Sequence, residues 1–134
     1  MITHHAALIY TMVLVSAADN NMPDVELHSI GDMVMHLPVF RDFDRKNLTK
    51  VTRECADLLR DQDGLDKAFK DIRAALPAKL RETAYALACE IAAADGKVTQ
   101  EESRMLEMVR HRLEIGRLPA AAIERGARAR HATI

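Results

Sequence analysis

The run AALIYTMVLVSAA, residues 6–18, is the one stretch of this chain that is apolar enough to suggest a membrane segment. It has thirteen residues before Asp19 ends it, whereas a membrane-spanning helix needs about twenty. The first basic residue is Arg41, so the basic segment that precedes the apolar run of a signal peptide is missing. We therefore expect a helix over residues 3–17, apolar on most faces and buried at the centre of a bundle, in a cytoplasmic protein with no direct membrane insertion.

The composition of the whole chain favours an all-α, single-domain bundle over residues 1–134. The 134 residues are 49% hydrophobic and 4% aromatic, with no Trp and five Gly. Abundant Ala and Leu suit helices and are poor material for a sandwich or barrel. The formal net charge of -1 argues against nucleic acid as a partner, because a dedicated nucleic-acid binder is markedly basic. Cys55 and Cys89 are far apart and outside any CxxC pattern, so we expect buried, reduced thiols.

Apolar residues three and four apart predict about seven helices in all. After the first helix, the others are expected over residues 24–36, 48–59, 65–76, 77–94 and 99–116, with a short seventh helix from residue 119. The boundaries come from local signals, such as Pro38 after the second helix. Thr99 and Glu102 form the pattern of a capping box at the start of the sixth.

The end of the opening run occurs a second time in the chain. Ala17-Ala18-Asp19 corresponds to Ala93-Ala94-Asp95, and in both copies an aliphatic residue and a Glu follow at the same spacing: Met22 and Glu26 in the first copy, Val98 and Glu102 in the second. Each copy predicts an apolar helix, a tight turn and a second helix that begins near the Glu. The fold is therefore expected to contain two pseudo-repeated helical hairpins.

This duplicated pattern resembles the signature of the TerB family of tellurite-resistance proteins, in which an Ala-Asp-Gly turn is followed by an aliphatic residue and a Glu. Asp95-Gly96 through Glu102 match it well, whereas the first copy has Asn20 in place of the Gly and Pro23 at the start of the helix. The resemblance covers most of the chain and implies a small all-helical domain. It also implies cation binding at an acidic surface and a cytoplasmic scaffold or sensor with a protein partner, membrane-bound in some members.

Asp and Glu at this spacing have two interpretations. In the first, they only cap helices, because the free N–H groups and the dipole of a helix N-terminus favour carboxylates. In the second, the two hairpins pack about a pseudo-two-fold axis and four carboxylates converge on a divalent cation: Asp19, Glu26, Asp95 and Glu102. Carboxylate oxygens suit Ca²⁺, Mg²⁺ or Mn²⁺, and Zn²⁺ is a further candidate. The turns do not have the spacing of an EF-hand loop.

The histidines suggest a second, weaker metal site. If the first two helices form an antiparallel hairpin, His5 lies beside His36, with His4 and Asp32 nearby. Three imidazoles and a carboxylate can hold Zn²⁺. The alternative is that these are ordinary polar residues at helix ends.

Charge is unevenly distributed despite the neutral total. Residues 1–40 contain no Lys or Arg, whereas residues 110–134 contain six Arg and two Glu. The basic segment is either a solvated helix face that neutralises the acids of residues 1–40, or a docking patch for an acidic partner or an anionic membrane surface. No aromatic residue lies among these arginines to stack on nucleic-acid bases.

The sequence contains no P-loop, GxGxxG, GxSxG or HExxH motif. We therefore expect a non-catalytic, TerB-like stress-response module that binds a cation, a protein partner or both. The alternative is a metal-dependent hydrolase that uses the same carboxylates.

Overall fold

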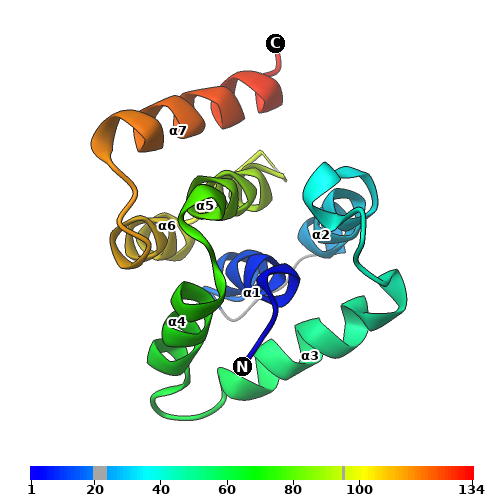
Figure 1. The fold of residues 1–134 in the computed structure, drawn as a ribbon. Coiled ribbons are helices and arrows are strands. Elements are labelled where there is room, and N and C mark those ends of the chain that lie inside the picture. The colour runs from blue at the N-terminus through cyan, green and yellow to red at the C-terminus, as the bar shows by residue number, and fades with distance from the viewer. Residues whose placement is uncertain (20–23, 95) are drawn as a thin grey trace.

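The computed structural model describes residues 1–19, 24–94 and 96–134, and within these ranges every regular element is helical (Figure 1). The elements are α1 (His4–Ser16), α2 (Asp24–His36), η1 (Pro38–Phe40), η2 (Arg45–Asn47), α3 (Leu48–Leu58), α4 (Gly64–Ala75), α5 (Ala78–Ala93), α6 (Gln100–Arg112) and α7 (Arg117–His131). The expected all-α fold with seven α-helices is confirmed for the described part of the chain. The two η elements are single turns of 3-10 helix between α2 and α3.

Helix α1 lies at the centre of the bundle, with the other helices around it (Figure 1). Every residue from His5 to Ser16 is buried, because α1 packs against five other helices: α2, α3, α4, α5 and α6. The even distribution of apolar side chains around α1 is explained by this position. The prediction of a buried central helix is confirmed.

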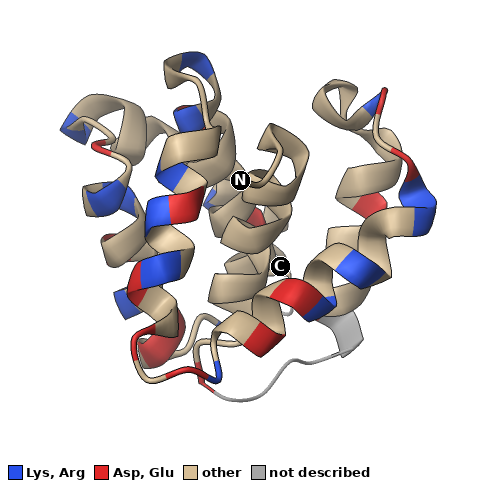
Figure 2. Cartoon of the chain, turned by 60° about the horizontal axis from the view of Figure 1, so that its bottom comes forward, with Lys and Arg blue, Asp and Glu red and all other residues tan. Residues whose placement is uncertain are grey.

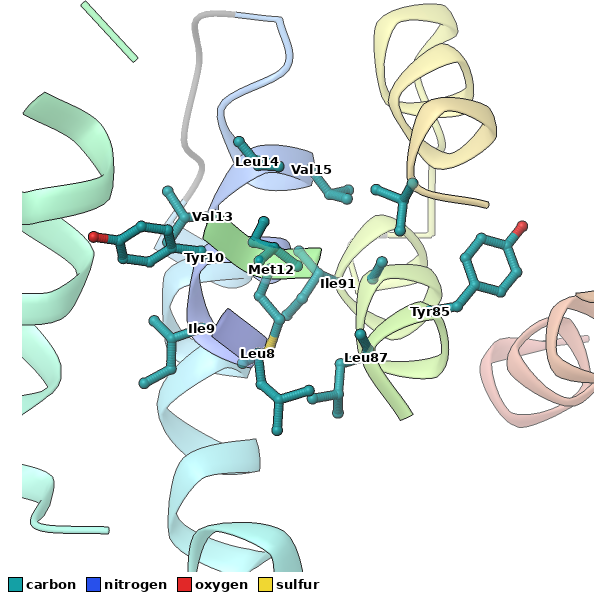
Figure 3. Close-up of a cluster of buried hydrophobic side chains, with 14 of the residues drawn as sticks. Leu8, Ile9, Tyr10, Met12, Val13, Leu14, Val15, Tyr85, Leu87 and Ile91 are labelled. Atoms are coloured by element: carbon teal, nitrogen blue, oxygen red, sulfur yellow. The ribbon is translucent and has the colours of Figure 1, made fainter. Parts of the chain in front are cut away.

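Helix α5 is the main partner of α1, and the two run in the same sense through the core. Leu8 and Leu87 lie at one end of the buried cluster in Figure 3, and Val15 lies at the other end. Ile91, one turn after Leu87 on α5, lies nearer to Val15 in this view, so α5 runs towards the same side of the cluster as α1 does (Figure 3). On its other side α5 packs against α7, and the ring of Tyr85 points that way (Figure 3).

Helix boundaries follow the local signals closely, with differences at the last two helices. Helix α6 ends at Arg112 rather than near Gly116, because Glu114 has a φ of 57° that a helix does not accommodate. Helix α7 begins at Arg117, two residues before Pro119. Pro119 is tolerated in this first turn because its N–H would have no helical partner there.

Two further predictions concern the cysteines and the possibility of a membrane-spanning helix. Cys55 and Cys89 are free thiols, and both are buried as expected. No helix in the described ranges is both long and apolar enough to cross a membrane.

Candidate functional site

The second motif hairpin joins α5 to α6 through a turn that contains Gly96. Gly96 has a φ of 78°, a left-handed conformation that glycine adopts without steric cost. Its N–H donates a hydrogen bond to the carbonyl of Ala93 at 3.1 Å. Val98 follows on the surface, about half exposed. The glycine of the motif is therefore explained by the backbone geometry of the turn.

Glu102 and Thr99 form the predicted capping box at the start of α6. The Thr99 N–H donates to Glu102 Oε1 at 3.1 Å, and the Glu102 N–H donates to Thr99 Oγ1 at 3.1 Å. Only 2% of Glu102 is exposed. The predicted capping box is thus confirmed, and it leaves the oxygens of Glu102 with lone pairs for further contacts.

The first motif hairpin places Asp19 in the turn after α1 and Glu26 on α2. Asp19 lies half-buried in the turn after α1. Glu26 lies in the first turn of α2 and has no exposed surface. It occupies the position in α2 that corresponds to Glu102 in α6.

Glu26 and Glu102 are the two buried carboxylates among the described residues. Removing a carboxylate from water is costly unless hydrogen bonds or a positive charge compensate it. The structure thus buries the Glu of both motif copies at the same place in the hairpin. This equivalence supports the internal repeat that the sequence indicates.

Asp95, the remaining acid of the predicted cation site, lies outside the described residues. Convergence of Asp19, Glu26, Asp95 and Glu102 therefore stays a prediction. Within the described ranges, no three side chains of His, Cys, Asp or Glu lie together as ligands of one metal ion.

The histidines make other contacts than those expected from an antiparallel hairpin. His5 Nε2 lies 3.0 Å from the Val39 carbonyl and 3.1 Å from Asp42 Oδ1, and its ring contacts Phe40 and Phe43. His36 Nδ1 lies 2.9 Å from the carbonyl of Asp32, one turn back on its own helix. The rings of His4 and His5, neighbours in the sequence, contact each other with centroids 4.1 Å apart. The segment after Pro38 folds over the start of α1 and takes the place beside His5 where the sequence suggested His36.

A cavity of about 500 Å³ lies between α5, α6 and α7, directly beside the second motif hairpin. The wall contains Ala92 and Ala93 from α5 together with Ala127 from α7. Their short side chains leave space where longer ones would fill the groove. This cavity was not predicted, although the alternation of Ala with longer residues in these two helices is a signal for it.

The polar part of the cavity contains a hydrogen-bonded pair. The hydroxyl of Tyr85 donates to Glu124 Oε2 at 2.5 Å. Burial, and then this hydrogen bond, raise the pKa of Tyr85 well above its ordinary value. Cys89 also lines the cavity, and burial raises the pKa of its thiol to about 11. Both groups therefore carry their protons at neutral pH, which is unfavourable for nucleophilic chemistry.

Two arginines of the carboxyl-terminal segment pair with acids on neighbouring helices rather than with the acids of residues 1–40. Arg112 Nη2 lies 2.9 Å from Asp66 Oδ1 on α4, and Arg130 forms an ion pair with Glu90 on α5. Figure 2 shows that positions of Lys and Arg alternate with positions of Asp and Glu along the outer helices. The interpretation that this basic segment neutralises the acids of residues 1–40 is therefore wrong for these two arginines.

The fold and motifs define a class of protein: an all-α bundle with two equivalent hairpins, each carrying a buried glutamate in the first turn of its second helix. The family model described as "Tellurite resistance protein TerB" matches residues 5–125, so the chain belongs to the TerB family. Comparison with curated proteins and with solved structures gave no match.

Proposed function

We propose that this chain is a non-catalytic, cytoplasmic module of the stress response linked to tellurite resistance. It binds a divalent cation through Asp19, Glu26, Asp95 and Glu102 and presents the hairpins, fixed in this way, to a protein partner. One observation carries the proposal: Glu26 and Glu102 are both buried at equivalent positions of the two hairpins. Capping alone does not require burial, because a carboxylate can cap a helix end at the surface.

A divalent cation would compensate the negative charge of the motif carboxylates. Carboxylates that come close together in a buried site repel each other unless a cation neutralises them or some of them take up protons. Oxygen ligands favour a hard divalent ion such as Ca²⁺, Mg²⁺ or Mn²⁺, and Zn²⁺ also binds carboxylate oxygens. Helices α1 and α5 run towards the same side of the core (Figure 3), and the negative ends of two helix dipoles favour a cation there.

The partner and the location complete the proposal. A cation that relieves the repulsion would hold both turns in one arrangement. A partner that binds this arrangement would therefore bind in response to the cation. The two buried free thiols, Cys55 and Cys89, are typical of a reducing compartment such as the cytoplasm.

Calorimetric titration of the metal-free protein with Ca²⁺, Mn²⁺ and Zn²⁺ tests the cation site. We expect saturable heat with at least one of these ions and its loss in Asp19→Asn/Asp95→Asn. The matched control is Asp61→Asn/Asp63→Asn, which removes two acids from the turn between α3 and α4 and should bind like the original chain. No heat with any ion, or unchanged heat in Asp19→Asn/Asp95→Asn, contradicts the proposal.

Glu102→Gln separates cation binding from capping. Gln keeps an oxygen that accepts the Thr99 N–H but removes the negative charge, so the variant should stay folded and bind the cation at least tenfold more weakly. The non-catalytic part of the proposal would be overturned by metal-dependent hydrolysis of an ester or phosphoester that Glu26→Gln/Glu102→Gln abolishes.

A further inference from the structure

The cavity between α5, α6 and α7 has a volume of about 500 Å³, within the range of about 300–1,000 Å³ typical of small-molecule sites. It shares no residue with the four acids of the proposed cation site.

The cavity has an apolar body. Ala92, Ala93 and Ala127 line it from α5 and α7, Leu106 lines it from α6, and Val98 extends it at the surface. An apolar ligand group placed here would leave water, which is favourable in proportion to the area it buries.

Two arginines line the same cavity, Arg110 from α6 and Arg128 from α7. Each is followed two positions later by an arginine with an ionic partner: Arg112 pairs with Asp66, and Arg130 with Glu90. Arg110 and Arg128 differ from them, because neither has a carboxylate within ion-pair distance in the described part of the chain; Arg110 Nη2 lies 3.5 Å from His111 Nε2. Residues two apart on a helix point to different sides, so each helix turns one arginine to a neighbouring helix and one to the cavity.

The carboxylates of the lining limit the charge of a ligand. Glu124 accepts the hydroxyl hydrogen of Tyr85 at 2.5 Å, and Glu107 is exposed at the edge of the cavity. Two arginines and two glutamates leave the lining without net formal charge. A polyanion such as a nucleoside triphosphate would be repelled by the two glutamates. A single anionic group can instead accept charge-assisted hydrogen bonds from both guanidinium groups.

We infer that this cavity binds a small amphiphile, an apolar chain or ring with one anionic group, with the apolar part against the alanines and the anionic group at Arg110 and Arg128. The simplest ligand of this class is a medium-chain carboxylate. This site is distinct from the proposed cation site.

Calorimetric titration with decanoate, below the concentration at which it forms micelles, tests the inference. We expect saturable binding that strengthens from hexanoate through octanoate to decanoate, by up to about fourfold for each methylene buried. Decyltrimethylammonium has the same apolar chain and the opposite charge, and should bind at least tenfold more weakly than decanoate. Equal binding of the two probes, or affinity that does not change with chain length, overturns the inference.

Variants locate the site. Arg110→Gln/Arg128→Gln should weaken decanoate binding about tenfold or more, because charge-assisted hydrogen bonds are lost. Arg125→Gln is the matched control, since Arg125 lies on α7 outside the cavity lining, and it should change binding less than twofold. A loss of affinity in Arg125→Gln equal to that in the double variant contradicts the assignment.

Filling the cavity supplies an independent test. Ala127→Leu should abolish decanoate binding, and Ala93→Leu, at a half-exposed position, does the same with less risk to folding. Circular dichroism verifies the fold of both variants. If a folded variant binds decanoate as tightly as the original chain, the ligand does not occupy this cavity and the inference is wrong.

Discussion

The hydroxyl of Tyr85 on α5 donates a 2.5 Å hydrogen bond to the carboxylate of Glu124 on α7. Tyr85 is 2% exposed, so the bond ties the last helix of the chain to the core from within. Hydrogen bonds to a charged acceptor are stronger than neutral ones.

Tyr85→Phe should therefore destabilise the protein by about 1.5–3 kcal/mol, because Glu124 loses its buried donor. Chemical denaturation monitored by circular dichroism measures the loss. If the two residues act as a pair, the double variant Tyr85→Phe/Glu124→Gln should lose less stability than the sum of the losses in the two single variants. Strictly additive losses would show that the bond contributes little.

The stability of the protein should fall at alkaline pH. Burial raises the pKa of Cys55 from 9.0 to about 12 and that of Tyr10 from 10.0 to about 12, and the pKa of Cys89 and of Tyr85 is also raised. A pKa that is higher in the folded state means that the folded protein holds the proton more tightly. The contribution of these groups to the free energy of unfolding is therefore fully present below pH 9. It is lost as the pH rises from 9 towards 12. Melting temperatures recorded at steps across this range test the prediction, and Tyr85→Phe should make the decline above pH 10 shallower.

The capping box at the start of α6 predicts a cost for Thr99→Ala. The hydroxyl of Thr99 accepts the Glu102 N–H at 3.1 Å, and loss of such a cap costs about 1 kcal/mol. Thr133→Ala, in the exposed segment after α7, is the control and should change the free energy of unfolding by less than about 0.5 kcal/mol. Urea denaturation of both variants measures the difference, and equal stabilities would contradict the role of the cap.

Two methionines give a matched test of the core. Met12 on α1 is completely buried, whereas Met35 on α2 is 52% exposed. Met12→Ala should lower the free energy of unfolding by about 2–5 kcal/mol, because it removes buried apolar surface and leaves a cavity. Met35→Ala should cost less than about 1 kcal/mol. A similar loss in both variants would place the centre of the core elsewhere.

Two glycines should respond to alanine with opposite signs. A Cβ at Gly31, inside α2, would meet nothing within 4 Å, so Gly31→Ala should stabilise the protein by about 0.4–1 kcal/mol. A Cβ at Gly64 would lie 1.9 Å from the backbone carbonyl oxygen of Leu58, so Gly64→Ala should destabilise it by about 1–3 kcal/mol. Thermal unfolding of the two variants checks both signs.

The sequence alone predicted most of the helices because their signals are local. Pro38 and the capping box of Thr99 and Glu102 mark helix ends through steric and hydrogen-bonding rules that act within a few residues. The apolar run of residues 6–18 indicated a central helix because a helix without a polar face has no stable place at the surface. The duplicated Ala-Ala-Asp motif was sufficient to indicate the TerB family.

Tertiary structure alone decided which side chains meet across distant elements. His5 contacts Asp42 and Val39 rather than His36, because the chain after Pro38 folds back over the start of α1. The cavity exists because α5, α6 and α7 pack with alanines facing a shared space. Such contacts depend on the angles and rotations with which whole helices pack, and these follow from the sum of many small side-chain contacts rather than from any short stretch of sequence.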